Sequence, residues 1–123
     1  MTAPTYQLHS LRVTRAHTDV LQIERATIRG GRITCVVGPN GSGKSTLLHT
    51  LAFLAKPSGG RLSFQGAPVD FDSDLTNLRR RATLVAQEPL LFHRSVRSNL
   101  RYGLKQHGIR DDHRIDDALD QVG

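Results

Sequence analysis

Gly38-Pro-Asn-Gly-Ser-Gly-Lys-Ser-Thr46 is the stretch that decides the fold. It satisfies the pattern G-x-x-x-x-G-K-[ST] of a phosphate-binding loop, which joins a strand to a helix. The preceding segment, Ile33 to Val37, is short and almost entirely apolar, as expected of a strand buried in a parallel sheet. Beyond the loop, apolar residues follow helical spacing at Leu47, Leu48, Leu51 and Leu54. The flanks therefore predict the strand, loop and helix that the motif requires.

The spacing of the loop also predicts its chemistry. Its glycines allow successive backbone amides to turn inward around phosphates, and the new helix adds its positive end. Lys44 would reach the β- and γ-phosphates, the Ser45 hydroxyl would bind magnesium, and Thr46 would lie near the α-phosphate. The alternative is a glycine-rich turn that binds nothing. The candidate nucleotide-binding residues are Gly38, Pro39, Asn40, Gly41, Ser42, Gly43, Lys44, Ser45 and Thr46.

The remaining segments predict an α/β arrangement. Tyr6 to Thr14 and Val20 to Ile28 alternate between apolar and polar residues, which favours two antiparallel strands. Arg61 to Gln65 is a candidate edge strand, and Ala82 to Ala86 is a second strand of the buried type. Helices are expected from Ser73 or Asp74 to the arginine run, from Ser95 to Gln106, and from Asp112 to Val122.

Composition limits the function classes. The net charge is +6, but only Arg79-Arg80-Arg81 forms a basic run, and no aromatic platform accompanies it, so we expect no nucleic-acid partner. The most apolar stretch, Leu47 to Ala55, is far shorter than the roughly 20 residues of a membrane span. The first residues show no secretory pattern, so we expect no export. The single cysteine, Cys35, is predicted to be a small residue of the core.

The residues of the loop, Gly38 to Thr46, resemble the Walker A motif of ATP-binding cassette (ABC) ATPases. A second stretch, Arg81 to Phe92 followed by Ser95 to Leu104, is similar to the Q-loop region of that family and the start of its helical subdomain. Gln87 stands where the Q-loop glutamine stands, 43 residues after Lys44. The resemblance implies that Gln87 approaches magnesium and the attacking water and couples the nucleotide site to a transmembrane partner. Without that match, Gln87 reads as a surface residue at a strand end.

The resemblance covers nearly all of the chain and implies an incomplete P-loop NTPase of ABC type. Residues 1–87 would form the N-terminal antiparallel β-subdomain and the RecA-like core around the Walker A loop. Residues 88–123 would begin the helical subdomain. One departure concerns adenine, because the family places an aromatic about six residues before Leu21. Arg15, Ala16 and His17 occupy that neighbourhood instead, and His17 or Arg15 could stack in its place.

Other family motifs are not found in this sequence. The resemblance places the Leu-Ser-Gly-Gly-Gln signature, the Walker B aspartate and the switch histidine after Gly123, and the acids between Asp111 and Asp120 lie in a polar helical segment. We expect a truncated product or fragment that binds ATP without useful hydrolysis. We also expect Ile33 to Val37 and Ala82 to Ala86 to be left exposed by the missing strands, with poor independent stability.

The resemblance implies a cytoplasmic, peripheral energy-coupling subunit of an importer, with ATP and Mg²⁺ as cofactors. Its partners would be a transmembrane permease and a second nucleotide-binding subunit. The segment Gln87 to Leu104 is most similar to importers of tungstate, molybdate or phosphate. Two alternatives remain open from the residues: a non-catalytic nucleotide-binding module, and a different phosphate-loop enzyme such as a nucleoside kinase or GTPase.

Overall fold

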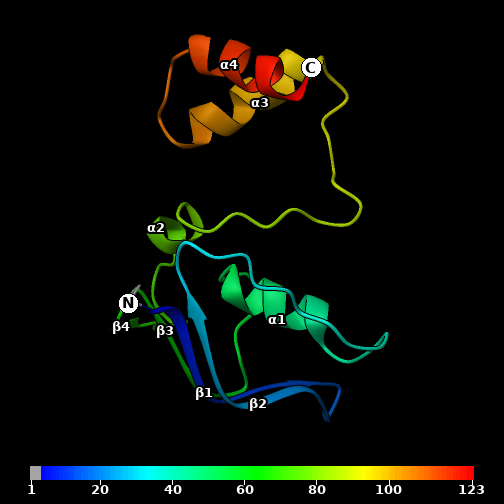
Figure 1. Ribbon diagram of the computed structural model, residues 1–123, viewed down its shortest axis with the longest axis vertical. Helices are drawn as coiled ribbons and strands as arrows, with labels where there is room; N and C mark the ends of the chain where they lie inside the picture. The colour runs from blue at the N-terminus through cyan, green and yellow to red at the C-terminus, as the bar shows by residue number, and fades with distance from the viewer. Residues whose placement is uncertain (1–3) are drawn as a thin grey trace. The chain divides into compact units, whose positions relative to one another are not determined.

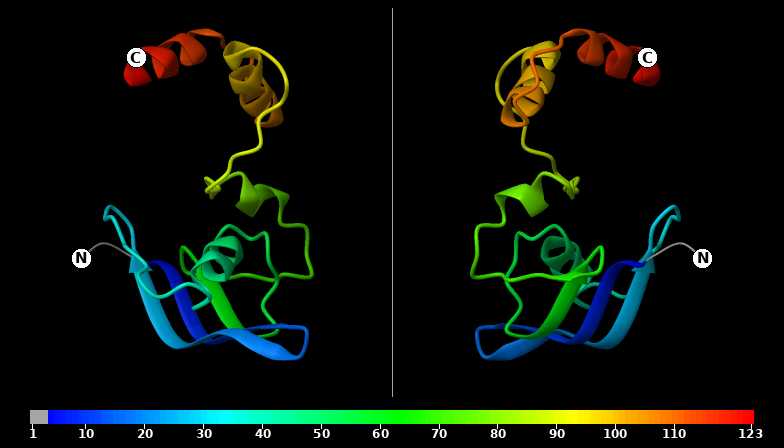
Figure 2. Two further views of the ribbon diagram at one scale, coloured as in Figure 1. Left: turned by 90° about the vertical axis from the view of Figure 1, so that its right-hand side faces the viewer. Right: turned by 90° about the vertical axis from the view of Figure 1, so that its left-hand side faces the viewer.

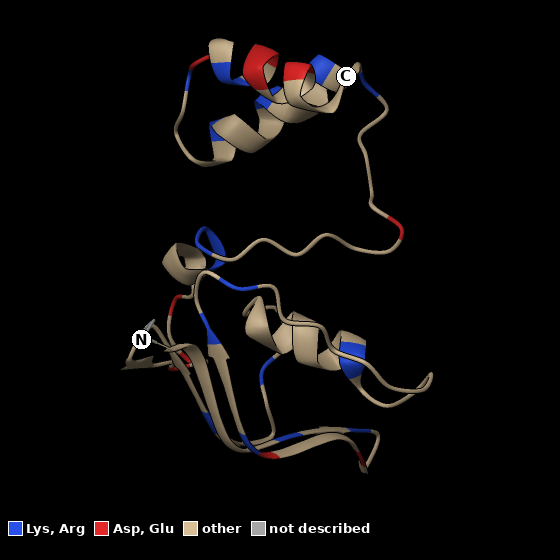
Figure 3. Cartoon of the chain, in the orientation of Figure 1, with Lys and Arg blue, Asp and Glu red and all other residues tan. Residues whose placement is uncertain are grey.

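The computed structural model describes residues 4–123, which divide into two compact units, one ending at Leu84 and the other spanning Val85–Gly123. The first unit contains all the strands of the described residues, and the second contains two helices (Figure 1). No helix of the described residues is both long and apolar enough to cross a membrane. Lys and Arg are spread along both units, and a basic group gathers where α2 (Thr76–Arg79) ends (Figure 3).

The first unit is built on an antiparallel sheet of four strands in the order β2-β1-β3-β4. The two long strands β1 and β2 lie next to each other in this sheet, and α1 lies over one face of the curved sheet (Figure 2). The expected strand pair at the N-terminus is confirmed, with Leu8 opposite Ala26 and Val13 opposite Leu21. The elements are β1 (Pro4–Arg15), β2 (Thr18–Arg29), α1 (Lys44–Leu51), β3 (Gly59–Phe64), β4 (Ala67–Pro68) and α2.

The core of the first unit lies between the sheet and α1. Leu8, Leu11 and Val13 of β1 are buried on the face of the sheet that packs against the core. The register shifts between His9 and Arg12, which is why the step from Leu8 to Leu11 is three residues and not two. Phe53 and Phe64 pack edge to face, with ring centroids 5.3 Å apart, and aromatic pairs of this geometry add about 0.5–1.5 kcal/mol beyond burial. The core cluster comprises Leu8, Leu11, Val13, Leu21, Leu47, Leu51, Phe53, Leu62, Phe64 and Leu75.

The prediction of strands at residues 33–37 and 82–86 is wrong, because neither segment forms regular secondary structure. Residues 33–37 and 82–86 run as irregular chain, and Ile33 and Val37 are 96% and 88% exposed. The reason is pairing: a buried strand needs hydrogen-bonded neighbours, and the sheet formed by residues 4–123 includes neither segment. Cys35 is exposed for the same reason, which corrects its assignment to the core. The exposure of these segments was itself expected from the sequence.

The helix after the glycine-rich loop is confirmed, but it is shorter than its apolar spacing suggested. It ends at Leu51, and the chain turns at Phe53 with φ of +60°. Leu47 and Leu51 face the core, whereas Leu48 is exposed. The expected short helix before the arginine run is also present as α2. Asp74 supports its start, because its carboxylate accepts the Thr76 amide at 3.0 Å.

The second unit consists of α3 (Val96–Gln106) and α4 (His113–Val122), as the sequence predicted. Ser95 caps α3 by accepting the Ser98 amide at 3.2 Å. Arg101 of α3 bonds both carboxylate oxygens of Asp112, at 3.0 and 2.5 Å, and Ile115 is buried. Hydrogen bonding from Arg101 lowers the pKa of Asp112 below its ordinary value.

Candidate functional site

The glycine-rich loop, Gly38–Thr46, ends in the first turn of α1. The first bond of the helix runs from the Leu47 amide to the Gly43 carbonyl at 2.8 Å. The amides of Lys44, Ser45 and Thr46 therefore have no acceptor within the helix. No acidic residue stands in the first turn and no side chain caps Gly43, so these donors and the positive end of the helix dipole are uncompensated by the helix itself. Such a helix start favours an anion.

Gly43 fits the loop for two independent reasons. Its φ of +91° is a conformation that other residues adopt at a cost. A Cβ at this position would also lie 2.5 Å from the Val20 carbonyl oxygen and 3.1 Å from Cδ1 of Leu21. Strand β2 thus holds the loop at the point where α1 begins. Gly41 needs only the first property, because its φ is +81° and a Cβ there would meet open space.

The Lys44 side chain folds back over the loop. Its Nζ donates to the carbonyls of Gly38 and Pro39, each at 2.7 Å, and lies 3.5 Å from Oγ of Ser42. The loop is closed further by the Ser42 amide, which donates to the Pro39 carbonyl at 3.2 Å. The structure therefore places the ammonium group inside the loop whose last residues begin α1. Residues 38–42 are exposed, so solutes have access to the loop.

Ser45 and Thr46 occupy different environments. Ser45 is exposed, so its hydroxyl is available to a ligand. Thr46 is 9% exposed. The Thr50 hydroxyl, one turn further along α1, donates to the Thr46 carbonyl at 2.9 Å. A contact from Thr46 to a phosphate would therefore come from its amide rather than its packed side chain. Nδ1 of His49 lies 2.7 Å from the Ser45 carbonyl oxygen, a contact that sequence reasoning did not anticipate.

The contact of β2 with Gly43 was not predicted from the sequence. Val20 and Leu21 belong to a strand whose residues alternate for packing, and nothing in that pattern says which loop the strand meets. Leu21 is buried in the core cluster, so the wall behind Gly43 is part of the packed interior. Only the three-dimensional arrangement could reveal this contact.

The other predicted site residues lie away from the glycine-rich loop in sequence. Gln87 belongs to the second unit and is exposed in a bend, and its approach to the nucleotide site stays a prediction. His17 is exposed in the turn between β1 and β2, with φ of +65°. Its proposed stacking on adenine stays a prediction.

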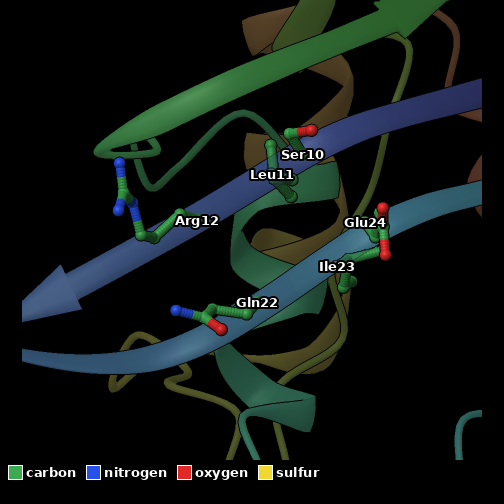
Figure 4. A pocket seen from close by; sticks show the side chains of 6 residues that line it. All are labelled: Ser10, Leu11, Arg12, Gln22, Ile23 and Glu24. Carbon is green, nitrogen blue, oxygen red and sulfur yellow. The ribbon is translucent and has the colours of Figure 1, made fainter.

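A hollow of about 480 Å³ elsewhere in the first unit does not involve the glycine-rich loop. It lies across β1 and β2, and it presents one cation, Arg12, and one anion, Glu24 (Figure 4). Gln22, also at this hollow, donates to the Asp19 carboxylate at 2.6 Å. This mixture of charges lacks the uncompensated helix amides that follow the glycine-rich loop, so Gly38–Thr46 is the stronger candidate site.

Comparisons with known proteins match most of the chain. A family model described as "ABC transporter" matches residues 21–123. Antigen peptide transporter 2 of Rattus norvegicus is 46% identical over 92 residues, which are 74% of this chain and 13% of that protein. ABC multidrug transporter E of Aspergillus fumigatus is 33% identical over 122 residues, 98% of this chain and 10% of that protein. The chain thus spans only a small part of these curated relatives.

Solved structures give the same result for the fold. CbiO1 of Clostridium perfringens, part of the ABC transporter complex cbiONQ, has a TM-score of 0.83 and 30% identity. That match covers 98% of this chain and 51% of the other. A bacterial Atm1-family ABC exporter with ATP bound has a TM-score of 0.73 and 26% identity, covering 81% of this chain and 18% of the exporter.

Proposed function

Because this chain belongs to the ABC transporter family and has the fold of its ATPases, we propose that Gly38–Thr46 binds the phosphates of ATP with Mg²⁺. The observation that carries the proposal is that one loop combines an ammonium group with a helix start whose amides have no acceptor within the helix. Nζ of Lys44 lies at the Gly38 and Pro39 carbonyls, and the helix that follows begins with uncompensated donors. A helix start beside a cation binds anions in general, and the G-x-x-x-x-G-K-[ST] pattern of this loop favours a polyphosphate among them.

The loop fits this ligand. Lys44 donates to neutral carbonyls, and phosphate oxygens would offer it charged acceptors, which form stronger hydrogen bonds. The exposed Ser45 hydroxyl would hold Mg²⁺, and the amides of Lys44, Ser45 and Thr46 would bind phosphate oxygens. ATP with Mg²⁺ supplies the phosphoryl group whose transfer to water powers transport in this family. The residues of this chain bind and orient that group.

The rest of the assignment is proposed on the family alone. Residues 1–87 would be the β-subdomain and phosphate-loop core, and residues 88–123 the start of the helical subdomain. Gln87 would sense magnesium and the attacking water and couple them to a transmembrane permease. The parent would work beside a second nucleotide-binding subunit, on the cytoplasmic face of the membrane, which it reaches through the permease.

The transported substrate is a separate proposal. Similarity of residues 87–104 to importers of tungstate, molybdate or phosphate favours an oxyanion. The relatives named above are described as an antigen peptide transporter and a multidrug transporter, and one related structure is an exporter. These matches favour a peptide or another organic cargo, and we consider this the better supported choice. Uptake and efflux assays on the full transporter with each cargo class would decide between them.

Equilibrium titration with a fluorescent ATP analogue in the presence of Mg²⁺ tests the nucleotide site. Lys44→Ala should weaken binding by about tenfold or more, because it removes the charged donor of the loop. Lys56→Ala is the matched control: it removes a lysine of the same unit that pairs with Asp72 on the surface, and it should leave binding unchanged. Equal affinity of the wild type and the Lys44 variant would refute the assignment.

Phosphate release separates an enzyme from a binding module. If the chain binds ATP without releasing phosphate, it acts as a nucleotide-binding module in isolation. Steady release that Lys44→Ala abolishes would instead establish hydrolysis by this chain and overturn the expectation of inactivity. Titration with GTP and with nucleosides tests the remaining alternative of a GTPase or nucleoside kinase.

A further inference from the structure

The outer face of the sheet, which is the face turned away from α1, carries a row of basic side chains (Figure 2). The opposite face packs into the core through apolar residues of β1, β2 and β3, which include Leu8, Ala26 and Leu62. Successive side chains of a strand point to opposite faces, so the residue beside each of these three lies on the outer face. Those outer residues are exposed and form what we call the basic row: Arg25, His9 and Arg61.

The three members of the basic row are direct neighbours across the sheet. The register places His9 opposite Arg25 of β2 and opposite Arg61 of β3. Adjacent strands lie about 4.8 Å apart, so the backbones at the two arginines are separated by ~9.5 Å, with the imidazole between them. Half of that separation is within the reach of an arginine side chain. Both guanidinium groups can therefore approach a single anion that lies over His9.

The basic row is not neutralised within the part of the chain that the structure describes. No member of the row forms an ion pair or a side-chain hydrogen bond with another described residue. Glu24 is next to Arg25 in the sequence, but it lines the hollow at the bend of the sheet and makes no ion pair with that arginine (Figure 4). Arg12 also lies on this face: a Cβ at Gly59 would be 3.3 Å from its Nη2, and Asp19 attracts its charge. The charge of the row therefore remains available to a ligand.

The donor groups of the basic row fit a phosphate group. Guanidinium groups form paired, charge-assisted hydrogen bonds with phosphate oxygens. Two guanidinium groups from opposite sides and an imidazole N–H between them supply donors in three directions, which suits a tetrahedral anion better than a carboxylate with its two oxygens. The next outer row of the sheet offers hydroxyl and amide groups to the rest of a phosphorylated molecule. The register sets its three residues side by side: Thr27, Gln7 and Ser63.

We propose that the basic row on the outer face of the sheet binds a phosphate group, carried either by free phosphate or by a phosphate ester. Arg25 and Arg61 donate to the phosphate oxygens from the two sides, and His9 contacts the anion from below. The site is open to solvent, so its affinity is in the millimolar range and falls as salt rises. The basic row shares no residue with the glycine-rich loop, so this site stands or falls separately from nucleotide binding.

NMR titration of the whole chain at constant ionic strength tests the site. The probes are inorganic phosphate and O-phosphoserine, and serine is the control without a phosphate group. Both probes should shift the side-chain Nε–H signals of Arg25 and Arg61 and the ring signals of His9 in a saturable way, whereas serine should not. Saturation by one probe alone would support the site and identify the free anion or the ester as its ligand. Shifts confined to the glycine-rich loop, or equal shifts on addition of chloride, would overturn the proposal.

Variants separate the basic row from the rest of the chain. Arg25→Gln and Arg61→Gln should each weaken phosphate binding by about tenfold, because each removes a charged donor. Arg110→Gln is the matched control: it removes an exposed arginine of the second unit and should change the affinity less than about twofold. Lys44→Ala should leave the shifts of the row unchanged. Loss of those shifts in the Lys44 variant would place the phosphate at the glycine-rich loop and overturn the proposal, as would equal affinity of the wild type and both glutamine variants of the row.

Discussion

Replacing Gly43 by alanine tests how β2 holds the glycine-rich loop. The new Cβ would lie 2.5 Å from the Val20 carbonyl oxygen, closer than real Cβ atoms come to backbone. The φ of +91° costs a non-glycine residue about 1–2 kcal/mol, and the displacement of backbone adds about 1–3 kcal/mol. We expect Gly43→Ala to lower the free energy of unfolding by ~2–5 kcal/mol.

Gly41→Ala separates the two contributions to that loss. Gly41 has a similar φ of +81°, but a Cβ there meets no atom within 4 Å. It should lose only the backbone cost, about 1–2 kcal/mol. Urea unfolding of both variants and the wild type, followed by circular dichroism, gives the difference directly. If the two variants unfold within about 0.5 kcal/mol of each other, the close approach of β2 does not constrain the loop.

Three further predictions rest on contacts elsewhere in the two units. Leu8→Ala should cost about 2–5 kcal/mol in urea unfolding because Leu8 is 1% exposed, whereas Leu48→Ala at 43% exposure should cost under ~1 kcal/mol. Asn99→Ala should speed amide exchange of the loop before α3, because the Asn99 side chain accepts one amide and donates to three carbonyls of that loop. Hydrogen bonding from Arg101 lowers the pKa of Asp112, so the stabilisation that this pair gives is present above about pH 4 and is lost as the pH falls further. The chemical shift of the Asp112 carboxylate, measured by NMR as a function of pH, would follow this titration. A midpoint at the ordinary pKa of aspartate would contradict the contact.

The conformation of the glycine-rich loop could be predicted from sequence because its signals are local. The loop from Gly38 to Thr46 requires glycines at fixed offsets, and the lysine side chain reaches its own loop. The start of α3 was equally local, since the Ser95 hydroxyl needs only an amide that lies three residues ahead. Interactions over such short separations leave a pattern that one segment is enough to show.

The two segments predicted as buried strands show the limit of that reasoning. Residues 33–37 and 82–86 have the composition of core strands, and composition correctly reports what they prefer to contact. Strand formation also needs partners for each backbone amide and carbonyl, and the partners are specified by other parts of a chain. The sheet of the described residues offers none, so both segments stay irregular.

Sequence by itself determined which residues form the glycine-rich loop, that a helix follows the loop and that another follows Ser95, because each depends on spacing within one segment. Tertiary structure alone decided that Val20 stands behind Gly43, that Thr46 is buried, and that Cys35 lies exposed. Those features depend on distances between segments far apart in the chain. Such distances are fixed by packing and by the pairing of strands, which no single stretch of residues encodes.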